Sequence, residues 1–96
     1  MDRTETLAQI LQMLTVAKNR VMVMALIFAC QAADEGEDWE SVSFEGPDEA
    51  RLELKRLFDL LMPFVVGLEP EPRTELRRAA VEKLRTMRDV RLERAN

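Results

Sequence analysis

The sequence predicts an all-helical domain from its composition and its apolar spacing. Leu, Ala, Glu and Arg are abundant and the 96 residues include only three glycines, a composition typical of helices rather than sheets. Apolar residues recur at helical spacing in three segments, which glycine or proline separates. A chain of this length has room for one domain. We therefore expect one domain over residues 1–96, built as a small bundle of about three helices.

The first helix is expected over residues 4–33. Asp2 and Glu5 have the spacing of a capping box at its start. Apolar residues then repeat every seven positions and predict one buried seam, formed by Leu7, Leu14, Val21 and Phe28. From residue 21 onward the opposite face is apolar as well, so the second half of this helix must be covered on all sides.

A loop over residues 34–46 and a second helix over residues 47–66 follow. The repulsion among the acidic residues of the loop and its two glycines oppose helix formation there. Pro47 suits a first helical position, and Asp48 and Glu49 suit the positive end of a helix dipole. Pro63 predicts a kink or break in the second helix, and Gly67 predicts a left-handed cap at its end.

The third helix is expected over residues 72–94. One face of this helix is apolar, and we expect it to be buried; its members are Leu76, Ala79, Ala80, Leu84, Met87 and Val90. Lys83 projects near the middle of this face. The sequence leaves two alternatives for Lys83: its chain runs past the edge of the bundle, or its ammonium group pairs with a carboxylate across an interface.

Catalytic and metal-site chemistry find little support in the composition. The chain has no histidine and no tyrosine, which excludes Ser/His and Cys/His nucleophile arrangements and leaves too few ligands for zinc. Asp34, Gly36, Asp38 and Glu45 have the spacing of a calcium loop, but Trp39 occupies the position where the turn requires glycine. No catalytic residue, metal site or cofactor is predicted, and we expect a protein without enzyme activity.

Charge is distributed unevenly along the chain, whose net charge is −4. Residues 34–49 include eight acidic residues and no basic one, whereas residues 73–94 include eight basic and four acidic residues. These two segments are the candidate interaction surfaces.

The acidic loop carries two aromatic residues, Trp39 and Phe44, among carboxylates that include Asp38 and Glu40. Two interpretations remain open. Either both aromatic side chains fold back onto the bundle, or they anchor a basic protein partner within a rim of negative charge.

The third helix carries an arginine stripe with two aliphatic residues, Val81 and Leu92, in it; its arginines are Arg77, Arg78, Arg85 and Arg88. The stripe is either a solvated face with intrahelical ion pairs or a contact surface for a protein, because arginine interleaved with aliphatic residues is typical of interfaces.

A homodimer is expected from the apolar residues that lie off the seam of the first helix: Met22, Val23, Leu26 and Ile27. Exposed together, these four side chains would form a larger apolar patch than monomers usually carry. A second copy with twofold symmetry is the simplest cover for them.

Targeting signals and membrane spans are not expected. The first residues are too charged for a secretory signal, and the longest apolar run, Val21 to Cys30, has half the length needed to cross a bilayer. The single cysteine, Cys30, lies in that run, and we expect it to be buried and inert. A cytoplasmic setting follows as an expectation.

The leading hypothesis for function is a non-enzymatic protein-interaction module, an adaptor or regulatory subunit that presents the acidic loop and the arginine stripe. The alternative is a small acidic inhibitor that occupies the nucleic-acid groove of a larger machine, as phage counter-defence proteins do, with carboxylates in place of phosphates. A third hypothesis is nucleic-acid binding through the last helix, which the carboxylates on that helix and the net charge oppose.

Overall fold

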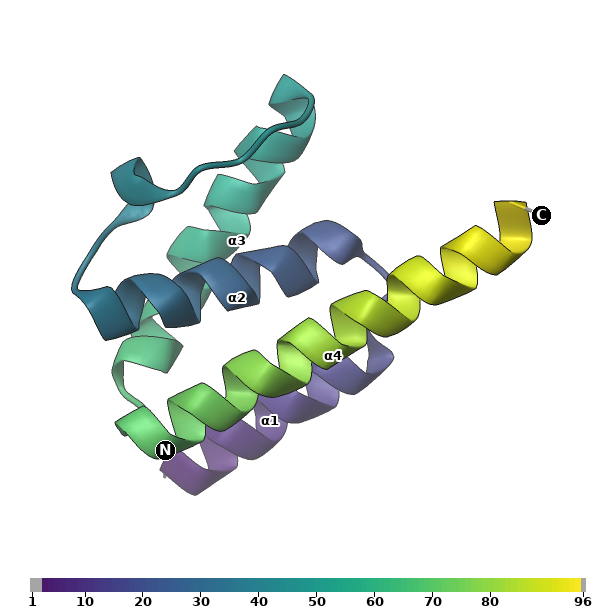
Figure 1. Cartoon of the computed structure of the whole chain (residues 1–96). Helices are drawn as coiled ribbons and strands as arrows, with labels where there is room; N and C mark the ends of the chain where they lie inside the picture. The colour runs from purple at the N-terminus through teal and green to yellow at the C-terminus, as the bar shows by residue number, and fades with distance from the viewer. Residues whose placement is uncertain (1–2, 96) are drawn as a thin grey trace.

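The computed structural model describes the backbone of residues 3–95 and the side chains of residue 5 and residues 7–87. Within that part of the chain the structure is all-helical and contains no strand, which confirms the predicted fold class. Four helices follow one another, α1 (Arg3–Val16), α2 (Arg20–Glu35), α3 (Asp48–Val66) and α4 (Pro70–Ala95), with a short 3-10 turn, η1 (Trp39–Ser41), before α3 (Figure 1). None of these helices is both long enough and apolar enough to span a bilayer.

The helix predicted over residues 4–33 is two helices, α1 and α2, separated by residues 17–19. Asn19 has an extended backbone, and its side chain accepts a hydrogen bond from the Val21 amide at 2.9 Å, which caps the start of α2. The Lys83 ammonium group donates to the Thr15 carbonyl oxygen at 3.0 Å, near the end of α1. Of the four predicted seam residues, Leu14 is buried, whereas Leu7, Val21 and Phe28 are only partly buried.

Helix α2 lies at the centre of the bundle, packed against α3 on one side and α4 on the other (Figure 1). Its buried residues include small ones, Ala25, Ala29, Cys30 and Ala32, which let neighbouring helices approach closely. The core facing them includes Leu54, Phe58, Leu61 and Val65 from α3, and Leu76 and Ala80 from α4. Helix α1 makes its main contact with α4, along which it runs.

The acidic loop folds back over the bundle. Gly36 adopts a left-handed conformation with φ of 68°, and its amide donates to the Ala32 carbonyl oxygen to end α2. The Trp39 ring then packs edge-on against Phe58 of α3, with ring centroids 5.4 Å apart. Val42 and Phe44 also pack against the core, so the loop supplies part of the cover for α2.

The end of α3 differs from the prediction in having no break at Pro63 and no left-handed cap, whereas the predicted kink stays a prediction. Helix α3 continues through Pro63 to Val66, and Pro63 and Asp59, whose carbonyl it crowds, both lie on the exposed side. Gly67 has φ of −75° and is not a left-handed cap. Arg73 of α4 takes over the capping role, because its guanidinium donates to the Val65 and Leu68 carbonyl oxygens at 2.9 and 2.7 Å.

Candidate functional site

The acidic loop begins at the end of α2, where negative charge is least favourable. Peptide dipoles leave partial negative charge at the C-terminus of a helix, so carboxylates there are repelled. Asp34 is compensated, since its carboxylate accepts a hydrogen bond from Arg73 at 2.8 Å and lies 3.9 Å from a nitrogen of Arg77. No ion pair joins any carboxylate of residues 35–49 to a cation in the described part of the chain.

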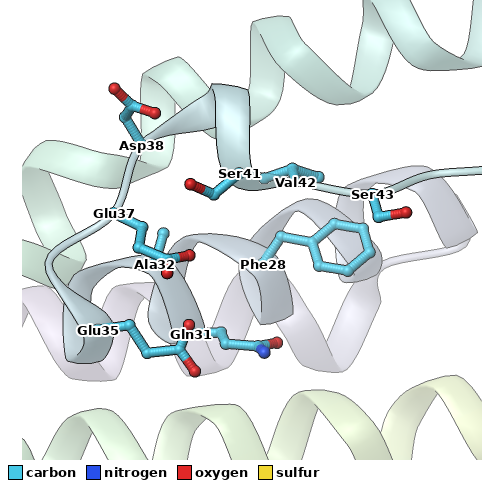
Figure 2. Close-up of a pocket in the computed structure, with 9 residues that line it drawn as sticks. All are labelled: Phe28, Gln31, Ala32, Glu35, Glu37, Asp38, Ser41, Val42 and Ser43. Carbon is cyan, nitrogen blue, oxygen red and sulfur yellow. The ribbon is translucent and has the colours of Figure 1, made fainter.

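A hollow of about 190 Å³ lies between α2 and this loop (Figure 2). Its apolar lining comes from Phe28, Ala32 and Val42, and its polar lining from Gln31, Glu35, Glu37, Asp38, Ser41 and Ser43. In Figure 2 the Asp38 carboxylate points away from the other labelled side chains. One oxygen of Asp38 accepts a hydrogen bond from the Glu40 amide at 3.1 Å, so Asp38 caps η1.

Trp39 and Phe44, the predicted anchors, are both partly buried against the core. The Arg51 guanidinium lies 5.2 Å from the centre of the Trp39 ring, in addition to the contact of that ring with Phe58. Trp39 therefore holds the loop on α3 and Phe44 packs against the core, and direct contact of either with a partner stays a prediction. Glu40 is exposed beside Trp39.

The arginine stripe forms a shallow hollow on α4. Its lining includes four of the predicted residues, Arg77, Arg78, Val81 and Arg85, together with Thr74 and Glu82. Arg85 pairs with Glu82 at 3.0 Å, and Arg77 lies near Asp34, whereas Arg78 makes no ion pair within the described part of the chain. The side chain of Arg88 lies outside the described residues. The stripe starts beside Asp34, so the basic and acidic surfaces meet at the end of α2.

The four residues predicted to form a dimer interface are covered within the single chain to different extents. Val23 is only 1% exposed and Leu26 only 3%, whereas Met22 and Ile27 are partly buried. Helices α3 and α4 and the folded loop supply the cover that we assigned to a second copy. The argument for a dimer through this face is therefore wrong for Val23 and Leu26, and dimer formation itself stays a prediction.

Arg73 and Lys83 are the charged residues whose roles sequence reasoning missed. Arg73 keeps only 11% of its side chain exposed and joins the ends of α2 and α3 to the start of α4. Its single signal in the sequence is its place in the first turn of a helix, where a cation opposes the helix dipole. The Lys83 ammonium group binds a backbone carbonyl of α1, and no carboxylate within the described part of the chain pairs with it.

Cys30 lies in the core beneath the cluster of Asp34, Arg73 and Arg77. Burial, helped by the negative charge of Asp34 and opposed by the two arginines, raises the pKa of the Cys30 thiol to about 12. Its predicted burial is confirmed, since the residue is fully buried. In the part of the chain that the structure describes, no three side chains of His, Cys, Asp or Glu are grouped to hold a metal ion.

Comparison with known proteins adds no constraint on this site, since no family model, curated protein or solved structure matches the chain.

Proposed function

We propose that this chain is a non-enzymatic protein-interaction module, an adaptor or regulatory subunit, whose acidic loop binds a basic segment of a partner protein. The observation that carries the proposal is the uncompensated charge at the end of α2. Glu35 and Glu37 lie where the helix dipole disfavours them, at a cost of roughly 0.3–1 kcal/mol each, and no cation of the described chain pairs with them. Charges kept at a cost to stability are typical of functional sites.

The hollow beside these carboxylates suits a lysine or arginine side chain of the partner. Its floor of Phe28 and Val42 would cover the aliphatic part of such a side chain, while Glu35 and Glu37 would bind the charged end. Because Trp39 ties the loop to α3, the loop pays little conformational entropy when the partner binds.

The arginine stripe is proposed as a second contact for the same partner. Arg78 supports this role best, because it is exposed and makes no ion pair within the described part of the chain. Nucleic-acid binding by α4 is less well supported, because Arg85 already pairs with Glu82 and Arg77 lies near Asp34.

The acidic inhibitor of a nucleic-acid machine remains the second candidate. The observation that favours it is the same row of carboxylates, which no cation of the described residues pairs with and which would then replace phosphates in a basic groove. It differs from the adaptor in one measurable respect, because nucleic acid would compete with the chain for the partner.

The test compares capture of cellular proteins by the immobilised wild-type chain and by two triple variants. One variant changes Glu35, Glu37 and Glu40 to Gln, and the matched control changes Glu5, Glu71 and Glu75, which are also exposed. Both variants lose three negative charges. We expect the wild type and the control to capture the same basic protein, with binding that weakens as salt increases, and the loop variant to lose it.

Equal capture by all three chains would contradict the proposal, and so would binding that salt does not affect. Adding nucleic acid to the captured complex separates the two candidates. Release of the partner indicates the acidic inhibitor, and retention indicates the adaptor.

A further inference from the structure

The hollow that the arginine stripe forms on α4 has a volume of about 280 Å³ and an excess of positive charge. It is lined by Thr74, Arg77, Arg78, Val81, Glu82 and Arg85, so that three arginines stand against one glutamate. Val81 lies one helical turn from each of these arginines, which therefore flank an apolar side chain. Arginine beside aliphatic surface is typical of protein interfaces.

The three arginines of this hollow differ in how far the chain itself satisfies them. Arg85 pairs with Glu82 at 3.0 Å. A nitrogen of Arg77 lies 3.9 Å from an oxygen of Asp34, which is too far for a hydrogen bond. Arg78 makes no ion pair within the described part of the chain. Two of the three guanidinium groups therefore keep N–H donors for an acceptor from outside the chain.

A solvated face with intrahelical ion pairs does not account for Arg78. On α3, Arg56 pairs at 2.6 Å with Glu53, which stands three residues before it. On α4, Glu75 stands three residues before Arg78, and both residues are exposed, yet the structure has no ion pair between them. The same spacing gives a pair on one helix and a free guanidinium group on the other.

The hollow on α4 and the hollow beside the acidic loop flank the same turn of α2. The Asp34 carboxylate is turned towards α4, where it lies 2.8 Å from a nitrogen of Arg73. The next residue, Glu35, lines the hollow beside the loop. Because successive residues of a helix point about 100° apart, the last turn of α2 separates the two hollows. A segment bound at one hollow therefore passes close to the other.

We propose that the hollow on α4 binds a carboxylate of the partner protein, carried by the same segment whose cation binds at the acidic loop. This inference rests on the proposed function and specifies the partner segment, which has a lysine or arginine near an aspartate or glutamate. A helix with its side chains is about 10–12 Å wide, and an extended chain advances about 3.3 Å per residue. The two charges of the segment should therefore lie about three or four residues apart.

Charge complementarity favours a carboxylate over a nucleic acid in this hollow. Glu82 lines it and Asp34 lies beside Arg77, so a continuous row of phosphates would meet carboxylates at both ends. The acidic loop adjoins it with further negative charge, since residues 34–49 include eight acidic residues. A single carboxylate avoids these repulsions, and the planar guanidinium group of Arg78 suits it with two parallel N–H donors.

The test titrates the isotope-labelled full chain with two synthetic peptides of equal length and follows the backbone amides by NMR. The mixed peptide has two arginines, three serines and two glutamates in that order, and the basic peptide has glutamines in place of the glutamates. Both peptides should shift amides that line the hollow beside the loop, whereas only the mixed peptide should shift amides of residues 74–85. The mixed peptide should bind about three- to tenfold more tightly than the basic peptide.

Two variants locate the origin of this difference. Arg78→Gln should bind the two peptides with affinities within about twofold of each other and leave the affinity for the basic peptide unchanged. The matched control is Arg56→Gln, which removes the same charge from an exposed arginine that lines neither hollow, and it should keep the full difference. Circular dichroism of both variants should match that of the wild type.

Equal affinity of the wild type for the two peptides would overturn this inference and leave the proposed function standing. Equal effects of Arg78→Gln and Arg56→Gln would do the same. If neither peptide shifts the amides of the hollow beside the loop, the proposed function fails and this inference fails with it. A single-stranded oligothymidylate that shifts residues 74–85 at a lower concentration than the mixed peptide would instead identify a nucleic-acid site and overturn the inference.

Discussion

The cations of α4 and the carboxylates that follow α2 are used in opposite ways. Arg73 and Lys83 bind carbonyl oxygens near the ends of α3 and α1, and Arg73 also binds Asp34. The carboxylates of residues 35–49 have no such ion pairs within the described part of the chain. A run of charge in a sequence therefore does not reveal whether it holds the fold together or faces a partner, since that depends on which groups the fold brings within reach.

The helix dipole predicts whether removing each charge raises or lowers stability. A cation at the C-terminus of a helix stabilises it, and a carboxylate at the same place destabilises it. Removing a cation of α4 should therefore cost stability, and removing a carboxylate at the end of α2 should increase it.

The largest effect is expected for Arg73→Met. This change leaves the carbonyls of Val65 and Leu68 without their donor and Asp34 without its closest cation, so the free energy of unfolding should fall by about 2–4 kcal/mol. Urea unfolding followed by circular dichroism measures it. Arg73→Lys should recover only part of the loss, because one ammonium group cannot reach all these acceptors. A loss below about 1 kcal/mol for Arg73→Met would show that α4 does not clamp the bundle.

The pH dependence of the free energy of unfolding tests the burial of the Cys30 thiol in α2. Because the folded pKa of Cys30 is raised from 9.0 to about 12, the unfolded chain loses this proton at a lower pH than the folded chain. Stability should be unaffected by the thiol below pH 9 and should fall as pH rises above it, by about 1.4 kcal/mol at pH 10. Urea unfolding of the wild type and Cys30→Ala measures this contribution as the difference between their pH profiles, and parallel profiles would contradict the prediction.

Lys83→Met should reduce the free energy of unfolding by about 1 kcal/mol, because a charge-assisted hydrogen bond to the Thr15 carbonyl is lost. Lys55→Met is the control, since Lys55 pairs with Asp59 on the surface of α3 and such pairs contribute about 0.5 kcal/mol or less. Urea unfolding should give Lys83→Met a clearly lower free energy of unfolding than Lys55→Met. The reverse order would show that Lys83 does not cap the end of α1.

The smallest effects on the free energy of unfolding are expected for glutamates at two helix ends, and their signs should be opposite. Glu35→Gln, in the last turn of α2, should stabilise the chain by about 0.3–1 kcal/mol, and Glu49→Gln, in the first turn of α3, should destabilise it by a similar amount. Both residues are exposed, so urea unfolding at low salt isolates the dipole term. Destabilisation by both changes would mean that negative charge at the end of α2 does not lower the free energy of unfolding.

The sequence by itself determined the local features of this fold. Apolar spacing predicted the helical class, the acidic run with two glycines predicted the break before α3, and Asp48 and Glu49 predicted the start of that helix. The need to cover α2 on all sides was also apparent from its composition. Each of these signals depends on neighbours within a few turns of the chain, which is the range over which periodicity and capping act.

Only the tertiary structure decided what covers each surface and which charges are satisfied. Asn19 caps the start of α2 and separates it from α1, although the apolar spacing alone favours one long helix. Val23 and Leu26 are covered by the same chain, and the bare apolar face lies instead around Leu60. Arg73 replaces a left-handed Gly67 because α4 places its guanidinium at the end of α3. These outcomes depend on contacts between residues far apart in the sequence, which local patterns do not specify.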